Sequence, residues 1–451
     1  MTSSRVAGLL HAALWTIAVI CAIWPAYRLI LDIEIDVNEG WNAYHADAVL
    51  GPEPLYPPQE ALVVNNYPPL SFIATALLAK VTCDAILAGR LLSFASTVAV
   101  AAAVALSIRR LGGTRMAASV GAAFYLGTMA RFFTNYVGMN DPHLFGQAVM
   151  SCAFLRFLHA WRTGGSLASP ISLMTIAGFI KHNQWMIPVV AFLWTSTYGW
   201  RRAVEFVGWA AAGLAVGFLA CYAAFDVDFF RNLLSPRIID WKHSINAIGH
   251  LQWLAVGLAA WAYTGTVLRS QWEIRLCNML VLTGLASFVI QKSGDGVAQN
   301  AMFDLLFAVS IGVGLAFEHA AELPASATRG ADGLRVILLA AICIRLLAST
   351  RTEPIRLFFD RNFHAEIAAR ERATATTVMR TKAVAGGVFG DVYPTYRAGK
   401  PFLVDTFSLQ QRIHTGRLPP DVLVRFVKQN GLAVVEADRN FSWTSEYKPN
   451  R

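Results

Sequence analysis

The residues best suited to chemistry begin with an acidic stretch just after the first apolar run. This stretch holds four carboxylates within eight residues, at Asp32, Glu34, Asp36 and Glu39. One interpretation is a solvated acidic cap at a membrane surface. The aromatic residues that follow favour a second one, because aromatic rings suit sugar stacking and headgroup contacts. A carboxylate beside such a surface can act as a general base in glycosyl transfer, so we predict a site here.

Aromatic, histidine and amide side chains near these acids are predicted to line the substrate. They are Trp41, Tyr44, His45, Asn66 and Tyr67. Pro68 and Pro69 follow directly, and prolines start a helix well because their missing N–H groups would be unpaired there anyway. Helix initiation therefore explains the prolines, whereas the residues before them stay candidates for hydrogen bonding to a ligand.

A second acidic position, Asp141, comes directly before Pro142. One interpretation is that it serves only as the N-terminal cap of a helix. A carboxylate at membrane depth is nevertheless costly unless it serves a site, and a helix N-terminus would keep it ionised. We therefore predict a catalytic role for Asp141, with Asn140 and His143 as lining residues.

Lys181 and His182 stand where two apolar runs of about 17 residues meet, which leaves almost no room for a loop. Snorkelling of the lysine to the headgroups is the simplest explanation. The dense polar cluster favours an anion site instead, in which both side chains neutralise a lipid phosphate.

Asn300 and Asp304 share one helix face by their four-residue spacing, and both are predicted lining residues. Asp304 falls inside an apolar run and should face the interior of a bundle. His45, His143 and His182 could gather round a metal with the acids, but no spacing requires one. We therefore predict no required cofactor, with a divalent cation as the alternative.

The composition indicates which elements must position these residues. The chain has 451 residues, of which 55% are hydrophobic and only 15% charged, and its mean hydropathy is +0.45. A soluble chain is usually about a quarter charged, so lipid is the main solvent, and a disordered, coiled-coil or disulfide-scaffold protein is excluded. The net charge of +9 indicates membrane topology rather than nucleic-acid binding.

Apolar runs close to the ~20 residues that cross a bilayer fill most of the first 350 residues. They predict an α-helical polytopic membrane domain over 1–350. The predicted spans, about eleven in number, lie near 7–30, 86–108, 116–136, 141–161, 167–183, 184–200, 204–224, 247–268, 274–292, 298–317 and 334–350. The apolar stretch at 68–82 is shorter and opens with two prolines, so it is predicted to lie in the interface.

The distribution of arginines sets the predicted orientation. An odd number of spans puts one set of arginines on a single side, which the positive-inside rule assigns to the cytoplasm. These are Arg109, Arg110, Arg115, Arg156, Arg162, Arg201, Arg202, Arg269, Arg275, Arg329 and Arg335. The N-terminus is then cytoplasmic, while the outer loop 31–85, the loop 225–246 and the tail lie outside. Alanine and arginine richness indicates a bacterium, so we predict its inner membrane.

Residues 351–451 differ in character from the rest. Short apolar patches at 383–385, 402–404 and 432–435 are typical of strands, and 422–427 has helical spacing. This alternation predicts a small extracytoplasmic α/β domain.

The order of these features resembles the GT-C membrane glycosyltransferases. The resemblance rests on Asn38-Glu39-Gly40, Tyr67-Pro68-Pro69-Leu70, Arg109-Arg110-Leu111-Gly112, Asn140-Asp141 and Lys181-His182. It covers about residues 7–200. The chain is similar to the branch that includes the aminoarabinose-to-lipid A transferases and the protein O-mannosyltransferases, known as glycosyltransferase family 39.

This resemblance implies a GT-C-like fold and a reaction. Such enzymes transfer a sugar from a polyprenyl phosphate to an acceptor hydroxyl outside the cytoplasm, usually with inversion. The acceptor would be a cell-envelope glycan, a glycolipid or a protein. The usual Asp-Glu pair of the first loop is Asn38-Glu39 here, so either Asp36 or Glu39 must be the base. Asp141 corresponds to the family's second acidic position, and Lys181 with His182 would stabilise the leaving phosphate.

Two other functions stay open. A secondary transporter or flippase of lipid-linked sugar would explain an intramembrane Asp304, although the polar groups crowd to one face rather than recurring in inverted halves. A noncatalytic scaffold whose C-terminal domain binds envelope polymer would leave the buried acids without a role.

Overall fold

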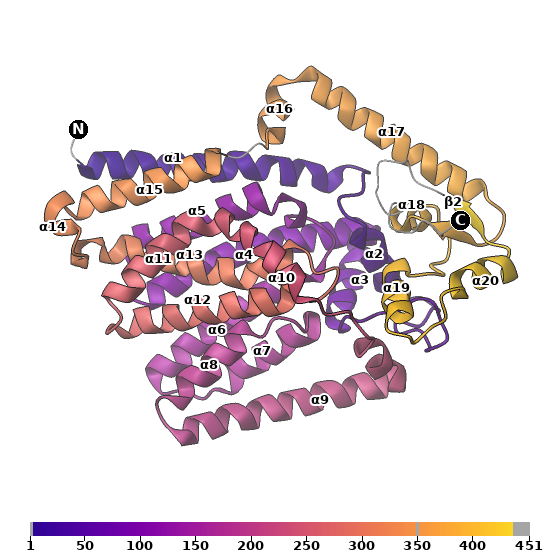
Figure 1. The fold of residues 1–451 in the computed structure, drawn as a ribbon, viewed down its shortest axis with the longest axis horizontal. Coiled ribbons are helices and arrows are strands. Elements are labelled where there is room, and N and C mark those ends of the chain that lie inside the picture. Colours follow the sequence, from indigo (N-terminus) through magenta and orange to yellow (C-terminus); the bar gives the residue numbers. More distant parts are fainter. Residues whose placement is uncertain (1–2, 349–350, 436–451) are drawn as a thin grey trace.

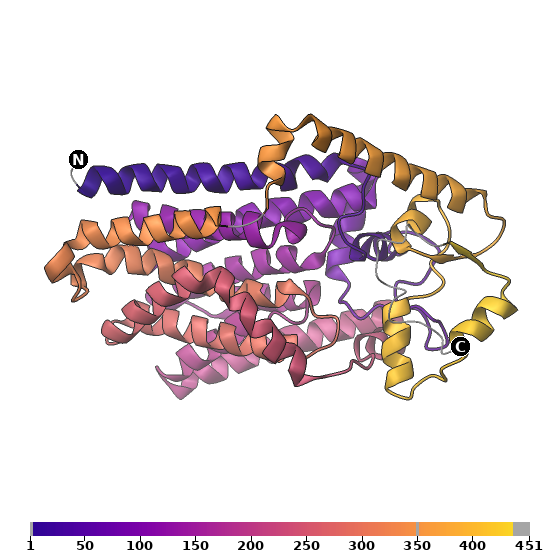
Figure 2. The ribbon, with the colours of Figure 1, turned by 45° about the horizontal axis from the view of Figure 1, so that its top comes forward.

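Helix α1 (Ser3–Tyr27) runs along a helical bundle in the computed structural model, which describes residues 3–348 and 351–435. The N-terminus lies at one end of this bundle, and α2, α3 and α18 lie at the other, which we call the outer end (Figure 1). Turning the molecule shows the same separation of the two ends (Figure 2). The N-terminus and the candidate site therefore lie at opposite ends of the bundle, and the side of the membrane that each end faces stays a prediction.

Each of the eleven predicted spans coincides with a helix. Besides α1 these are α4 (Ala85–Arg110), α5 (Arg115–Phe132), α6 (Pro142–Thr163), α7 (Ala168–Ile180), α8 (Met186–Ser196), α9 (Trp200–Leu233), α11 (Ala255–Val267), α12 (Trp272–Lys292), α13 (Phe303–Glu318) and α15 (Ala331–Leu347). In the described part of the chain, 5 helical stretches are long and apolar enough to cross a membrane. The chain is thus a multi-pass membrane protein, and the full number of crossings stays a prediction.

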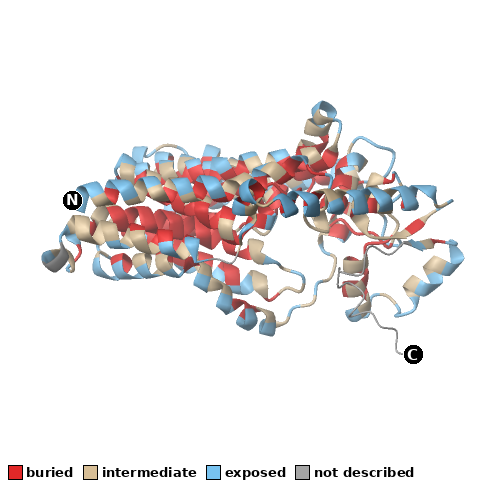
Figure 3. Ribbon diagram, turned by 90° about the horizontal axis from the view of Figure 1, so that it is seen from above, coloured by how far each residue is buried: buried red, intermediate tan, exposed pale blue. Residues whose placement is uncertain are grey.

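The core of the bundle is built around α13, in which every residue from Phe303 to Phe317 is buried. Helices α5, α11 and α12 pack directly on it. Buried residues fill the middle of the bundle while exposed ones cover its outside (Figure 3). Most of α9 is exposed and apolar, as expected for a helix that faces lipid.

Shorter elements connect these helices. They are α2 (Asn38–Ala48), α3 (Leu70–Thr82), α10 (Trp241–Ala247), α14 (Ser326–Arg329) and the 3₁₀ turns Arg28–Ile30, Thr134–Tyr136, Ile248–Leu254, Gln299–Met302 and His319–Glu322. Helix α3 begins directly after Pro68 and Pro69 and has 13 residues, which confirms the short helix predicted at 68–82. Its place in the membrane interface stays a prediction.

The C-terminal part combines helices with a two-stranded parallel sheet, which confirms its predicted α/β character. Its elements are α16 (Glu353–Phe359), α17 (Arg361–Ala383), β1 (Val388–Gly390), α18 (Val392–Arg397), α19 (Thr406–His414), α20 (Val422–Gln429) and β2 (Ala433–Val435). Two strand predictions were wrong. Helix α17 continues to Ala383, so β1 starts later than predicted, and 402–404 contributes a single bridge from Val404 to Leu62. The predicted domain boundary at residue 350 stays a prediction, and 436–451 lie outside the described residues.

The segment that follows α17 packs on the outer loop 31–85. A Cβ on Gly40 of α2 would lie 2.8 Å from backbone atoms of Val392 and Tyr393, so only glycine permits this approach. Tyr393 is buried in the contact, and its hydroxyl donates to Asp32. The residues 384–435, called the cap below, therefore cover the acidic stretch.

Candidate active site

The acidic stretch is fixed by one buried ion pair, between Glu39 and Arg90. Arg90 lies in α4 and donates from Nε to Glu39 Oε1 and from Nη2 to Glu39 Oε2, both at 2.7 Å. Both side chains are almost completely buried, at 1% and 0% exposure. Such a bidentate pair combines strength with a fixed orientation.

The same two side chains join three segments of the chain. Arg90 also donates to the carbonyl oxygens of Leu31 and Ile33, at 2.7 and 2.6 Å. Glu39 accepts from the backbone N–H groups of Ile35 and Asn140, at 2.8 and 3.2 Å. The pair therefore holds the loop before α2 against the loop before α6, and those loops carry Asp36 and Asp141.

Asp32 and Glu34, two further carboxylates of the stretch, are respectively bound in an ion pair and largely protonated. Asp32 forms an ion pair with Arg397 of the cap, with a 3.1 Å Nε–Oδ1 distance. Burial and the nearby Asp391 carboxylate raise the pKa of Glu34 to about 8, so most of it is protonated at neutral pH. Neither group is suited to accept a proton at the centre of a site.

Asp36 is the remaining carboxylate of the stretch. Its Oδ1 accepts from the backbone N–H and the side-chain amide of Asn38, at 3.0 and 2.7 Å. No described residue donates to its Oδ2. Burial raises the pKa of Asp36, and the Asp141 and Glu39 carboxylates raise it further. Asn38 thus cannot act as a base itself, but it orients a neighbour that can.

Asp141 lies on the adjacent loop and faces the same region. Its Oδ1 accepts from the N–H of His143 at 2.8 Å, so it does cap α6. Its Oδ2 has no hydrogen-bond donor among the described residues. Asp141 and Asp36 interact electrostatically with each other and with the buried Tyr136. Capping and a site role are therefore compatible, because the two oxygens do different things.

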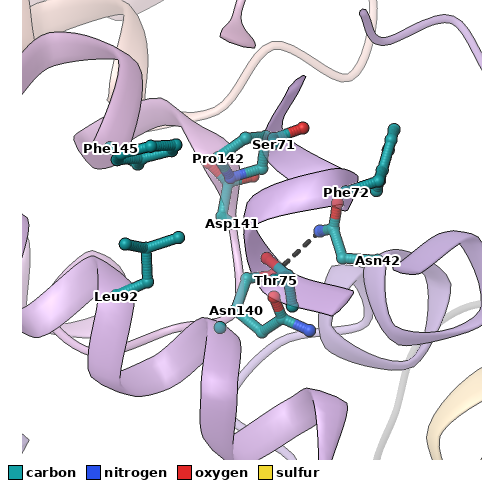
Figure 4. Close-up of a pocket in the computed structure, with 10 residues that line it drawn as sticks. Asn42, Ser71, Phe72, Thr75, Leu92, Asn140, Asp141, Pro142 and Phe145 are labelled. Carbon is teal, nitrogen blue, oxygen red and sulfur yellow. Dashed lines mark hydrogen bonds between the residues drawn. The ribbon is translucent and has the colours of Figure 1, made fainter. Parts of the chain in front are cut away.

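A small cavity opens beside Asp141, between α2, α3, α4 and α6 (Figure 4). Its polar lining consists of Asn42, Ser71, Thr75, Asn140 and Asp141. The side chain of Asn42 donates to the Asn140 carbonyl at 2.8 Å, drawn as the dashed line in Figure 4. Its own Oδ1 is buried and has no partner among the described residues. The cavity therefore offers acceptors and hydroxyls to a polar group.

Lys181 is a buried lysine that lies over an aromatic ring. Its Nζ lies 3.2 Å from the centroid of the Tyr67 ring, over the ring face. Among the described residues it has neither an ion pair nor a side-chain hydrogen bond, although it is only 3% exposed. It follows α7 directly and begins an extended turn before α8. A buried ammonium held only by an aromatic face is a strong candidate for binding an anion.

The neighbours of Lys181 include three further predicted site residues. His182 lies 6.4 Å from the Tyr67 ring, measured between centroids. His143 lies within electrostatic range of Lys181, and its Nδ1 is 3.3 Å from the side-chain nitrogen of Asn300. The structure therefore gathers these residues from the loops at the ends of α6, α7 and α12.

Asp304 lies one helical turn past Asn300, among the buried residues of α13. Its electrostatic neighbour is Tyr125 of α5, and its Oδ2 has no partner among the described residues. It does not line the cavity beside Asp141. Asn66 is half-buried and makes no side-chain hydrogen bond within the described ranges.

The aromatic residues of α2 connect the site to the cap. Trp41 packs edge-on against Tyr67, with ring centroids 5.1 Å apart, and its indole N–H donates to Asp405 at 3.2 Å. Tyr44 donates to the Lys400 carbonyl at 2.6 Å and stacks on Phe402. Trp41 thus faces the site, whereas Tyr44 has its partners in the cap.

His45 is fully enclosed by aromatic rings. It stacks on Trp41, with centroids 4.1 Å apart, and also packs on Phe72 and Phe402. Burial lowers its pKa to about 3, so the ring is neutral. The structure therefore places His45 in the packing between α2, α3 and the cap.

The chain is similar to known proteins in its fold rather than in its sequence. No protein-family model matches the chain, and no curated protein matches it in sequence. ArnT from Cupriavidus metallidurans, solved bound to undecaprenyl phosphate, superposes with a TM-score of 0.59 at 14% identity, over 95% of this chain and 94% of that one. The archaeal oligosaccharyltransferase AglB from Archaeoglobus fulgidus, solved with an inhibitory peptide and a dolichol-phosphate, gives 0.52 at 11% identity, over 89% and 65%. The chain has the GT-C fold.

Within this GT-C fold the structure adds residues that the sequence did not single out. Arg90 is the partner of Glu39, and Tyr136 lies within electrostatic range of Asp141, Asp36 and Tyr67. Asp405 holds Trp41, and the exposed Arg237 lies within electrostatic range of His182. The position of Arg90 inside an apolar run is a sequence signal that could have identified it.

The acids and histidines near the site are residue types that can also bind a metal ion. Within the described residues no three His, Cys, Asp or Glu side chains are placed to hold one together. Asp36 and Asp141 alone would supply two oxygen ligands to a divalent cation. The predicted independence from a cofactor stays a prediction.

Proposed function

We propose that this GT-C protein transfers a sugar from a polyprenyl phosphate to an acceptor hydroxyl at its outer end, in the bacterial inner membrane. The observation that carries the proposal is the placement of Lys181. A buried, unpaired ammonium lies in the same group of loops as two carboxylates that each keep an oxygen without a donor among the described residues. A phosphate and a reacting hydroxyl are the groups that such a pair of charges would receive.

Asp36 is the base in this proposal. It removes the proton from the acceptor hydroxyl while that oxygen attacks the anomeric carbon of the sugar. The bond from the anomeric carbon to the phosphate oxygen breaks, and the polyprenyl phosphate leaves with the electron pair. Glu39 is less suited to this role because both of its oxygens are bound to Arg90. Asp141 raises the pKa of Asp36 and offers its second oxygen to the acceptor or the sugar.

Lys181 supplies the charge that stabilises the leaving phosphate, with Arg237 near His182. Burial and the neighbouring Lys181 lower the pKa of His182 to about 4, so His182 would assist as a neutral hydrogen-bond donor rather than as a second cation. A phosphate diester already carries a charge, so the leaving group needs electrostatic stabilisation more than a proton. Lys181 would exchange its contact with the Tyr67 ring for the phosphate oxygens. The solved ArnT structure with undecaprenyl phosphate and the AglB structure with a dolichol-phosphate support a lipid-phosphate donor for a chain of this fold.

A transfer assay tests this function. Purified chain in vesicles is incubated with radiolabelled sugars on polyprenyl phosphate and with an envelope fraction that supplies acceptors. We expect label to move into a glycoside, and Lys181→Met to slow that movement by about 10²–10³-fold, as loss of one stabilising group does. Lys242→Met, an exposed lysine of α10, is the matched control and should retain the full rate.

Two results would contradict the proposal. Label that crosses the vesicle membrane with no glycoside formed would support a transporter or flippase. Equal rates for both lysine variants would remove Lys181 from the mechanism.

A further inference from the structure

Helix α16 has one packed face and one apolar face with no partner in the described protein. Leu357 is buried, whereas Ile355, Phe358 and Phe359 are 59%, 61% and 85% exposed. A seven-residue helix that leaves three large apolar side chains exposed would be poorly soluble in water. Something other than water therefore has to cover this face.

The packed face shows the level at which α16 lies. Leu357 and Phe363 form a buried cluster with Leu31, against Trp24 and Tyr27 of α1. Trp24 and Tyr27 follow a run of about 20 mainly apolar residues in α1, where tryptophan and tyrosine typically mark the headgroup level. Helix α16 is thus beside the outer end of a membrane-spanning helix.

The path of the chain also places α16 near the outer end of the bundle. Helix α16 follows closely after α15, whose last residue is Leu347, and lies against the outer half of α1 (Figure 1). From there α17 leads away toward the cap and packs on α18. Leu357 is the residue of α16 that packs toward α1, whereas Ile355, Phe358 and Phe359 are left exposed.

Charge favours lipid over an acidic or basic protein partner. Arg356 forms ion pairs with Asp360 at 2.9 Å and with Glu366 at 2.7 Å. Arg356, the arginine within α16 itself, is therefore already paired with two carboxylates. Aromatic and aliphatic side chains without free charge suit the boundary between headgroups and acyl chains.

We propose that α16 is an interfacial anchor that inserts Ile355, Phe358 and Phe359 into the outer leaflet. The anchor fixes the height of α17 above the membrane. Because α17 packs on α18 and α18 packs on α2, it also fixes the cap over the site at the level of the lipid headgroups. This inference depends on the membrane fold and not on the proposed transfer reaction.

Spin-label accessibility in nanodiscs of neutral phosphatidylcholine tests the anchor. The full chain carries a nitroxide on Phe359→Cys, in a background where the exposed Cys83 and Cys152 are serine. Met379→Cys is the matched control, because Met379 is 66% exposed and lies 18 residues beyond Arg361 on α17. That distance is about 27 Å of helix.

We expect the label at position 359 to collide several-fold more often with oxygen, which concentrates in lipid, than with a water-soluble nickel chelate. The label at 379 should show the reverse. Equal exposure of both labels to the nickel chelate would overturn the anchor. Protection of label 359 from both reagents would overturn it too, because that result indicates a protein partner on this face.

Discussion

An Asp36→Asn variant is expected to lose about 10²–10⁴-fold in transfer rate, the usual contribution of a general base. The asparagine keeps the size of the side chain but cannot take the acceptor proton. Donor binding should change little, because the phosphate is bound by Lys181 rather than by the base. The rate is measured in single-turnover transfer, and binding by titration with polyprenyl phosphate.

Glu34→Gln is the matched control for this result. Glu34 lies two residues away, and its raised pKa of about 8 means that glutamine mimics its protonated form at neutral pH. We expect nearly the full rate from this variant. An equal loss in both variants, or an unimpaired Asp36→Asn protein, would contradict the assignment of the base.

The pH dependence of the wild-type transfer rate should reflect the pKa of Asp36. The base acts when it is deprotonated, so activity falls as the pH drops through its pKa. Because burial and the carboxylates of Asp141 and Glu39 raise the pKa of Asp36, this fall should occur above the pH of about 4 typical of aspartate. In Asp141→Asn, where one neighbouring negative charge is gone, the remaining activity should extend to lower pH.

An Arg90→Met variant is expected to be destabilised by about 3–5 kcal/mol, the usual cost of leaving one partner of a buried ion pair unpaired. The fully buried Glu39 carboxylate would lose both of its guanidinium donors, and the carbonyls of Leu31 and Ile33 would lose theirs. The measurement is the midpoint of thermal unfolding in detergent. Transfer should also fall at temperatures where the variant is folded, because the loops that carry Asp36 and Asp141 are no longer held together.

Two further variants show whether the effect comes from the unpaired charge. Arg231→Gln removes a half-exposed pair with Asp228 and should cost at most about 1 kcal/mol. Adding Glu39→Gln to Arg90→Met removes the stranded charge and should recover part of the stability. If Arg90→Met unfolds at the wild-type temperature, the pair does not hold the site together.

The sequence predicted the helices well because their signal is local. A run of about 20 apolar residues has to be helical in lipid, where backbone groups cannot hydrogen-bond to water. The N-terminal cap at Asp141 and the helix start after Pro69 depend on neighbouring residues as well, and both were predicted. The strand at 432–435 was found as β2, but the other two strand predictions were wrong, because three-residue segments such as β1 carry almost no periodic signal.

The partners of the site residues could not be predicted because they come from distant parts of the chain. Glu39 and Arg90 are 51 positions apart, and Trp41 and Asp405 are 364 apart. No local pattern predicts that both oxygens of Glu39 bind Arg90, whereas one oxygen of Asp36 has no donor among the described residues. The sequence therefore left two candidates for the base, and the contacts of each side chain favour one.

The most direct test of the central claim is an experimental structure of the full chain in a lipid nanodisc with polyprenyl phosphate. We expect the phosphate to lie within hydrogen-bond distance of the Lys181 ammonium, on the side that faces Asp36 and Asp141. A phosphate bound at the end of the bundle where α1 begins, or one at the outer end with Lys181 still seated on Tyr67, would contradict it.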